Sequence, residues 1–435
     1  MKKFSLLYYR FIGTIDGMRM AFDMKKFYIA TMIGSGFAFL AAVLSLVNDL
    51  GYTLVENSLI YLAVAAVIVV AVAVFKGFYD YVSTARTYVL KKDNRYKKEV
   101  LERLTLSNHM VEDGYRISTF FNGCFSEYYV MSDECNHYLY TNFNIIRLVK
   151  HRNKFQIVKE IRNYVPFAVS ALLKNNYVTF NGSTIRQMDE LFLDMKAMHV
   201  QPSKYFDGQC TNELVYAKMR NTSAINEVVY GENLLIDENN SLYELDDSPC
   251  SNYIGVSTLA ITEDNCLVIM KQGAASNANA QRYAPSGSGS SHGKDLKKAQ
   301  TLGEFLINGM ERELCEECNI NRKDTILTTR IIGYARLLER GAKPDFFGIT
   351  MISSESRNIA KGLRTSEFGL MSDDGVMIIE LKEKVEFTDE GIRNINAVSE
   401  ALEGLFLNNS FSGAPRISIQ LHIFNEIIKS FPQLP

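Results

Sequence analysis

Two long apolar runs without charged residues lie near the start of the chain. They cover residues 27–47 and 59–75, and neither contains Asp, Glu, Lys or Arg. An apolar helix needs roughly 17 to 25 residues to cross the hydrocarbon core of a bilayer, so both runs are long enough. A cleaved signal peptide is a poorer interpretation of the first run, which is longer than a typical signal core and has no Ala-x-Ala exit. The pattern therefore predicts a hairpin of two transmembrane helices.

Charged residues beside the two runs predict the orientation of this hairpin. Basic residues precede the first run and follow the second, whereas the connecting loop, residues 48–57, contains acids and no Lys or Arg. Because cytoplasmic loops carry an excess of Lys and Arg, both termini are expected to face the cytoplasm, from the inner membrane of a bacterium. The flanking basic residues are Lys2, Lys3, Arg10, Arg19, Lys25 and Lys26 before the hairpin, and Arg86, Lys91, Lys92, Arg95, Lys97 and Lys98 after it.

Small residues give the first predicted span one face that can pack closely. Gly34, Ala38 and Ala42 stand four positions apart, a spacing that lets two membrane helices approach each other. Packing against the second span and homo-oligomerisation explain this face equally well. Neither run contains an ionisable side chain, which disfavours a transporter or a proton relay because such functions usually need charge inside the membrane.

The C-terminal part of the chain alternates segments typical of strands with segments typical of helices. Apolar runs rich in β-branched residues predict strands, the first two of them joined by a Glu-Asp-Asn turn. Later segments with helical periodicity predict two helices. The strands are expected at residues 254–262, 266–270, 326–339 and 346–353, and the helices at 388–405, with Thr388 as N-cap, and at 417–431.

Less regular patterns fill the region between the second apolar run and these strands. Residues 88–106 predict a helix leaving the membrane, residues 128–149 and 177–180 predict strands, and residues 185–198 have helical periodicity. The chain is thereby divided into four parts. They are a cytosolic segment over residues 1–26, the transmembrane hairpin over 27–80, an intermediate α+β domain over 81–250 and an α/β domain over 251–435. For the intermediate domain, a structural role is favoured over ligand sensing.

The composition narrows the classes of partner. The 435 residues carry a net charge of −2, which gives no general attraction to nucleic acid, and 47% of them are hydrophobic, as in globular domains. The basic residues near the spans are better explained by orientation and by contact with anionic lipid. In the cytoplasm the seven cysteines are expected to be reduced.

A cluster of acids in residues 304–320 predicts a site for a divalent cation. Glu313 and Glu317 are separated by four residues and share one helical face, and Glu316 lies beside them. Hard oxygen ligands of this kind suit Mg²⁺ or Mn²⁺, which usually also contact substrate phosphates. An ordinary surface helix with Arg312 and Glu316 as an ion pair is the alternative. It is disfavoured because three acids within five residues repel one another.

This segment resembles the box of the Nudix family, in which Gly, five residues and Glu are followed, seven residues later, by Arg-Glu-aliphatic-x-Glu-Glu-x-Gly-aliphatic. Two positions depart from the pattern, because Lys298 and Asn319 replace its glycines. Asn319 can still end the helix, since Asn tolerates a left-handed backbone. The glycine-rich loop of the family is found earlier, at residues 284–290, followed by about a dozen additional polar residues that are expected to form a mobile element over the site. The matching residues are Glu304, Arg312, Glu313, Leu314, Glu316, Glu317 and Ile320.

The resemblance implies a Nudix-like α/β/α sandwich with a mixed sheet that hydrolyses a nucleoside diphosphate linked to another group. It assigns Mg²⁺ or Mn²⁺ to Glu313, Glu316 and Glu317, an orienting role to Arg312 and a supporting place in the catalytic network to Glu304. The general base is left open. It is Glu316 or a carboxylate from a later loop, Glu355 or Glu367. The candidates for substrate binding are Lys271, Gln272, Ser286, Gly287 and Gly289.

A second function from another class fits the same features. In it, the Nudix-like domain binds a nucleotide-derived signal without cleaving it, and the hairpin perturbs the membrane as an effector of a bacterial antiphage defence system. Intact carboxylates favour the enzyme, whereas the stretched loop and the replaced glycines favour the sensor. Both functions require a nucleotide-derived small molecule and the lipid bilayer as partners.

Overall fold

The computed structural model describes most of the chain after residue 87. The described residues are 88–121, 126–174, 181–222, 228–272, 282–362, 371–389, 391–407, 413 and 415–430, with a few short stretches between residues 68 and 79. The two predicted membrane spans therefore lie outside the described residues, apart from those short stretches. None of the helices within the described ranges is both long and apolar enough to cross a bilayer.

The chain divides into two compact units. Over the described residues, the first unit takes in the short stretches between residues 68 and 79 and residues 88–92, 158–174, 181, 218–222 and 228–229, and the second takes in those within 93–157, 182–217 and 230–430. The elements of the first unit are β1 (Tyr88–Lys92), most of β7 (Ala217–Asn221), most of β8 (Val228–Tyr230), the short helix η1 (Lys159–Tyr164) and α7 (Val165–Lys174). The three strands form one sheet in the order β1-β7-β8.

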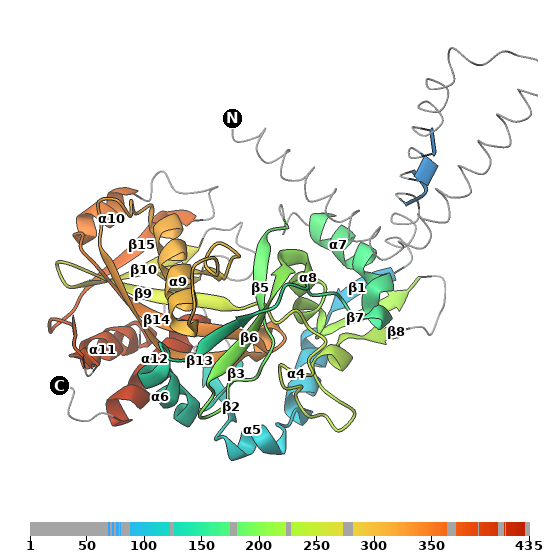
Figure 1. The fold of residues 1–435 in the computed structure, drawn as a ribbon, viewed down its shortest axis with the longest axis horizontal. Coiled ribbons are helices and arrows are strands. Elements are labelled where there is room, and N and C mark those ends of the chain that lie inside the picture. The colour runs from blue at the N-terminus through green and yellow to red at the C-terminus, as the bar shows by residue number, and fades with distance from the viewer. Residues whose placement is uncertain are drawn as a thin grey trace, which may run out of the picture. The chain divides into compact units, whose positions relative to one another are not determined.

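A nine-stranded mixed sheet forms the centre of the second unit (Figure 1). Its main path runs β11-β10-β9-β14-β13-β3-β2, while β12 pairs with β9 and β15 with β10. The pair β14–β9 is parallel, and the other pairs are antiparallel. The strands are β2 (Arg116–Phe121), β3 (Ser126–Met131), β9 (Gly255–Thr262), β10 (Cys266–Gln272), β11 (Tyr283–Pro285), β12 (Gly287–Ser290), β13 (Leu327–Leu337), β14 (Lys343–Ile352) and β15 (Met371–Glu380). The four strands expected in the C-terminal part are confirmed as β9, β10, β13 and β14.

Helices cover both faces of this sheet, so the layers are helix, sheet and helix. Successive side chains of a strand point to opposite faces. On β9, Leu259 and Ile261 pack toward α11 (Ile395–Phe406) and α12 (Pro415–Ser430), whereas Ala260 packs toward α9 (Leu302–Cys318). Figure 1 shows α9 on one side of the strands and α6, α11 and α12 on the other. The α/β class with a mixed sheet is therefore confirmed.

The remaining elements of the second unit are short. A small sheet in the order β4-β6-β5 consists of β4 (Arg147–Lys150), β5 (Ser183–Gln187) and β6 (Ala197–Lys204). A two-stranded hairpin is formed by β16 (Glu386–Phe387) and β17 (Ile392–Arg393). The other helices are α4 (Asn94–Arg103), α5 (Asn108–Glu112), α6 (Asp133–Asn142), α8 (Tyr205–Gln209), η2 (Asn212–Leu214), η3 (Gly231–Leu234), η4 (Leu338–Arg340) and α10 (Ser356–Gly362).

Two expected helices begin later than predicted. Residues 388–405 were expected to be helical from Thr388, but Thr388 forms the turn of the β16–β17 hairpin, where its Oγ1 accepts a hydrogen bond of 3.1 Å from the Gly391 amide. Helix α11 starts only after Asn394, whose φ is 57°. Residues 88–106 begin as strand β1, and the helix follows the N-cap Asp93.

The intermediate region differs more strongly from its expected elements. Residues 185–198 are not a helix but run from β5 through a turn into β6, with Asp194 at a φ of 60°. The reason is tertiary, because Glu190 is buried in that turn and forms an ion pair of 2.6 Å with Arg336. Residues 128–149 contain helix α6 between the strands β3 and β4. The strand expected at residues 177–180 lies outside the described residues.

Candidate functional site

Helix α9 carries the acidic cluster, and polar residues define both of its ends. Thr301 is the N-cap, and its Oγ1 accepts a hydrogen bond of 3.2 Å from the Glu304 amide. The Glu304 carboxylate in turn accepts hydrogen bonds from the amides of Gln300, at 2.6 Å, and Thr301. Asn319 ends the helix with a φ of 52°, as expected from its tolerance of a left-handed backbone.

Glu304 is therefore placed as a capping residue rather than beside the other acids. It lies 12 positions before Glu316, and a helix rises about 1.5 Å per residue, so roughly 18 Å of helix separates the two. The backbone hydrogen bonds that it accepts lower the pKa of Glu304. The structure does not bring it together with Glu313, Glu316 and Glu317.

Arg312 occupies the centre of the acidic face. Its Nη1 donates hydrogen bonds to Glu313 Oε1 at 2.8 Å and to Glu316 Oε2 at 3.1 Å. Its Nη2 also donates to the Ser290 carbonyl at 2.9 Å. Although burial disfavours the charged form, hydrogen bonds to Asp295 and the charge of Glu313 raise the pKa of Arg312. The orienting role expected for Arg312 is compatible with these contacts.

Asp295 is a central residue of this site that the sequence did not single out. It is 4% exposed, and its two carboxylate oxygens accept hydrogen bonds of 2.8 and 2.9 Å from Nε and Nη2 of Arg312. The His292 amide donates to Asp295 Oδ2 at 2.7 Å, which fixes the carboxylate. The sequence signal that could have indicated it is that Asp295 is the single acid in the Ser/Gly-rich loop before Arg312. The polar insertion expected to be a mobile element thus supplies a buried part of the site.

Two glycines of β12 let this strand approach α9. A Cβ at Gly289 would lie 2.2 Å from the Glu313 carboxylate, and one at Gly287 would lie 2.6 Å from the Leu314 backbone. Between them, the Ser288 amide donates a hydrogen bond of 2.9 Å to Glu317 Oε2. Glycine is required here for close contact, since neither position has a positive φ.

Burial and mutual repulsion change the acidity of the carboxylates. Burial raises the pKa of Glu313 against the opposing effect of Arg312. The pKa of Glu317 is raised well above its usual value by burial and by the nearby charge of Glu313. Glu316 is more open, with 48% of its side chain exposed. Carboxylates that share a face in this way favour a cation among them.

A buried group of charged residues, Arg416, Asp345 and Lys343, lies beside Gly289 of β12. Arg416 of α12 donates to Asp345 Oδ2 through Nε at 2.6 Å and lies 3.5 Å from the Gly289 carbonyl through Nη2. Lys343 pairs with the second oxygen of Asp345. Burial, with the charge of Arg416, lowers the pKa of Lys343 to about 7. Although burial opposes it, Arg416 and Lys343 together lower the pKa of Asp345.

The residues expected to bind substrate lie near this strand but differ in availability. Ser286 is fully buried, and its Oγ donates to the Val268 carbonyl at 2.5 Å and accepts from the Ala260 amide at 2.7 Å, so its polar groups are used within the sheet. Lys271 places its Nζ 5.7 Å from the centre of the Tyr283 ring. Gln272 is the last residue of β10.

The alternative bases expected from later loops are not joined to the acidic face by any described contact. Glu355 pairs with Arg357 and is 44% exposed. Glu367 lies outside the described residues. Of the three candidate bases, Glu316 is the one that the structure places on α9 beside the other acids.

The carboxylates of α9 share a face without closing around one point. Among the described residues, one group of three His, Cys, Asp or Glu side chains brings its ligand atoms within 4.8 Å of one another, and it consists of Asp133, His422 and Glu426. Arg312 Nη1 bridges Glu313 and Glu316, whereas Glu317 is bound separately by the Ser288 amide. The donor set of α9 suits a hard cation, and the side chains of Glu313 and Glu316 must move slightly to surround it.

Comparison with known proteins adds little to this description. No protein-family model and no curated protein matches the chain. A distant likeness is found to the crystal structure of DR0079 from Deinococcus radiodurans, with 12% sequence identity, covering 43% of this chain and 95% of that chain at a TM-score of 0.25. The conclusions about function therefore depend on the residues of the site itself.

Proposed function

We infer that the α/β domain hydrolyses a phosphoanhydride bond in a nucleotide-derived compound, using Mg²⁺ or Mn²⁺ bound by Glu313, Glu316 and Glu317. The observation that carries this proposal is the close approach of Gly289 to Glu313, which sets the backbone of a glycine-serine strand against three carboxylates of one helix. Carboxylate oxygens suit these cations. Mg²⁺ held by carboxylates usually also binds substrate phosphates.

The contacts of each side chain indicate its role in the proposed reaction. Arg312 is fixed by Asp295 and orients Glu313 and Glu316. A bound divalent cation would withdraw charge from the phosphate oxygens and make water more acidic. Glu316, the most exposed of the three acids, accepts the proton of the attacking water. The water oxygen forms a new bond to phosphorus, the bridging P–O bond breaks, and the departing phosphate takes the electron pair.

The membrane hairpin and the cytoplasmic position of the site remain part of this proposal. They rest on the two uncharged runs and on the distribution of basic residues around them. The hydrolase would then act on a cytosolic nucleotide compound at the inner surface of a bacterial inner membrane. The hairpin also offers a surface for homo-oligomerisation through Gly34, Ala38 and Ala42.

One observation favours the second candidate function, a nucleotide sensor that acts on the membrane in antiphage defence. Arg312 holds two of the three carboxylates through one nitrogen atom, and the acids do not converge on one point. A site that only binds a phosphate-containing signal could keep this arrangement. The intact set of acids favours the hydrolase, because a pure sensor has no need of three like charges.

A turnover assay on the full-length chain separates the two functions. The protein in detergent is incubated with Mg²⁺ or Mn²⁺ and with dinucleoside polyphosphates, nucleoside diphosphate sugars and cyclic oligonucleotides. The hydrolase cleaves at least one diphosphate-linked compound, Glu316→Gln removes that cleavage, and the surface variant Glu400→Gln retains it. Turnover that survives Glu316→Gln contradicts the mechanism. Tight binding without turnover supports the sensor.

A further inference from the structure

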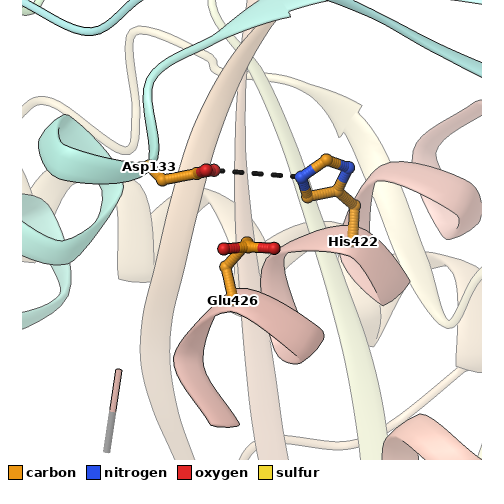
Figure 2. A group of neighbouring side chains, drawn as sticks. All are labelled: Asp133, His422 and Glu426. Atoms are coloured by element: carbon orange, nitrogen blue, oxygen red, sulfur yellow. Dashed lines mark ion pairs between the residues drawn. The ribbon is translucent and has the colours of Figure 1, made fainter. Parts of the chain in front are cut away.

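The N-terminus of α6 and the middle of α12 place three potential metal ligands side by side. Asp133 is the first residue of α6, and His422 and Glu426 stand one turn apart on α12. Figure 2 shows the three side chains pointing toward one another from these two helices. One ligand atom from each lies within 4.8 Å of the other two. The side chains of Asp133 and His422 are 23% and 24% exposed.

The contacts of His422 direct its Nε2 toward Asp133, where this nitrogen can act as a metal ligand. Its Nδ1 lies 2.8 Å from the Tyr129 hydroxyl, and its Nε2 lies 3.4 Å from Arg116 Nη2. A guanidinium group donates hydrogen bonds and never accepts them, so Nε2 in this contact carries a lone pair. Nδ1 then carries the proton and donates a hydrogen bond to the Tyr129 hydroxyl oxygen. In this tautomer, Tyr129 fixes the ring through Nδ1, and Nε2 can bind a metal.

Asp133 offers a free oxygen to the same point. Its Oδ2 forms an ion pair with Arg116, which fixes the carboxylate. Its Oδ1 is buried, has no hydrogen-bond partner and faces His422 Nε2 at 3.8 Å. A buried carboxylate oxygen without a hydrogen-bond partner is unfavourable, and a cation bound between it and His422 Nε2 would satisfy it. Ligands of one tetrahedral ion, with bonds of about 2.1 Å, stand roughly 3.4 Å apart, so a small adjustment is sufficient.

A cleft gives solvent access to this group. It is lined by Met131 of β3 and by residues of α6 and α12 that include Asp133 and Glu426. Glu426 binds Lys429 through Oε1 at 2.7 Å, which leaves its second oxygen available. An ion can therefore enter from solvent, and water can complete its coordination.

We propose that Asp133, His422 and Glu426 form a transition-metal site that joins α12 to α6, separate from the carboxylates of α9. One imidazole nitrogen with two carboxylate oxygens suits Zn²⁺, Mn²⁺, Fe²⁺ or Co²⁺ better than Mg²⁺ or Ca²⁺, which prefer ligand sets made only of oxygen. With three protein ligands, the ion keeps at least one position for water. Binding there holds the C-terminal helix against α6 and stabilises the fold.

Titration with Co²⁺ tests this site in the full-length chain. A large excess of Mg²⁺ is present to occupy sites made only of oxygen ligands, and the visible absorption of Co²⁺ reports binding. The wild type binds one Co²⁺ ion, and His422→Gln and Glu426→Gln each weaken that binding at least about tenfold. The control His199→Gln removes a more exposed histidine that also contacts an aspartate, and it leaves the binding unchanged.

Three results would overturn the proposal, the first two of which concern the amount of Co²⁺ bound. The first is the absence of Co²⁺ binding, and the second is equal binding by the wild type and Glu426→Gln. The third is an intense near-ultraviolet band from thiolate ligands, which would place the ion on cysteines. Glu426 is partly exposed, so Glu426→Gln keeps the fold even if His422→Gln disturbs the contact with Tyr129. Melting curves without metal verify that both variants are folded.

Discussion

Arg312 and Asp295 are joined by two parallel hydrogen bonds of 2.8 and 2.9 Å between an acidic helix and the loop that precedes it. The pair is nearly enclosed, with 18% of the arginine and 3% of the aspartate side chain exposed. Through it, the loop determines where Arg312 lies among the carboxylates. Two parallel hydrogen bonds between a guanidinium and a carboxylate fix the orientation of the guanidinium plane as well as its distance from the carboxylate.

Asp295→Asn is expected to lower both stability and activity. The substitution removes the charge of the most buried of the three carboxylates that pair with Arg312, which costs about 1.5–3 kcal/mol. Urea denaturation measures the free energy of unfolding, and turnover measures the displacement of Glu316. Asp324→Asn, which changes an exposed aspartate beyond the same helix, is the control and changes neither quantity appreciably. Equal stability of Asp295→Asn and wild type would show that the pair does not organise the loop.

Substitution of the two β12 glycines by alanine should have different effects. Gly287→Ala places a methyl group 2.6 Å from the Leu314 backbone, which cannot move freely, so stability falls by about 1–3 kcal/mol. Gly289→Ala meets only the end of the flexible Glu313 side chain, so it mainly reduces metal affinity. Thermal melting and Mn²⁺ binding distinguish the two.

Gly404→Ala is the matched control for these glycines. It lies in α11, and a Cβ there would contact nothing within 4 Å. Because alanine is the better helix former, this variant gains up to about 1 kcal/mol. If Gly289→Ala lost stability but kept Mn²⁺ affinity, Glu313 would not be a metal ligand.

Replacement of Glu304 separates capping from catalysis. A capping box accepts Gln as well as Glu, so Glu304→Gln should melt near the wild-type temperature and retain turnover. Glu304→Ala loses the hydrogen bonds to the Gln300 and Thr301 amides and should melt earlier. Loss of turnover in a fully folded Glu304→Gln variant would instead support the catalytic role implied by the family resemblance.

Metal affinity should increase with pH because of Glu317. Its pKa is raised above the usual 4.5, so the folded, metal-free chain binds a proton there that the unfolded chain releases. This proton stabilises the fold at low pH, and the contribution is lost as the pH rises through the raised pKa. A cation competes with the same proton, so Mn²⁺ binds more tightly as the pH rises from about 4.5. Calorimetry should show a flatter pH profile for Glu317→Gln, and identical profiles would exclude Glu317 as a ligand.

Labelling of introduced cysteines tests the membrane hairpin. A cysteine at Asn57, in the loop without basic residues, should react with a membrane-impermeant reagent applied from outside the inner membrane. A cysteine at Lys98, an exposed position on α4, should not react. The reverse pattern would place the acidic helix outside the cytoplasm and exclude a cytosolic substrate.

Local sequence signals predicted the parts of the fold that depend on nearby residues. The β9–β10 hairpin, the acidic helix and its end at Asn319 follow from strand patterns, carboxylate spacing and one residue that tolerates a positive φ. The turn in residues 185–198 was not predictable in this way. Its helical spacing is overridden by the buried Glu190–Arg336 pair, whose members are far apart in the chain.

The candidate sites show the same division. The carboxylates of α9 could be recognised because they share one helix, and helical geometry fixes which of them face the same side. Asp295 could not be assigned, since nothing in a polar loop indicates which acid folds back onto Arg312. The group of Asp133, His422 and Glu426 combines the start of one helix with the middle of another, so only the tertiary structure reveals it.

Mn²⁺ binding to the full-length chain, followed by electron paramagnetic resonance, tests the central claim most directly. The measurement is made with His422→Gln as the parent, so that a site between α6 and α12 does not contribute. Addition of Glu317→Gln should weaken Mn²⁺ binding at least about tenfold, while addition of Glu400→Gln should leave it unchanged. Mn²⁺ affinity that is the same in the parent and in both double variants would contradict a metal site on α9.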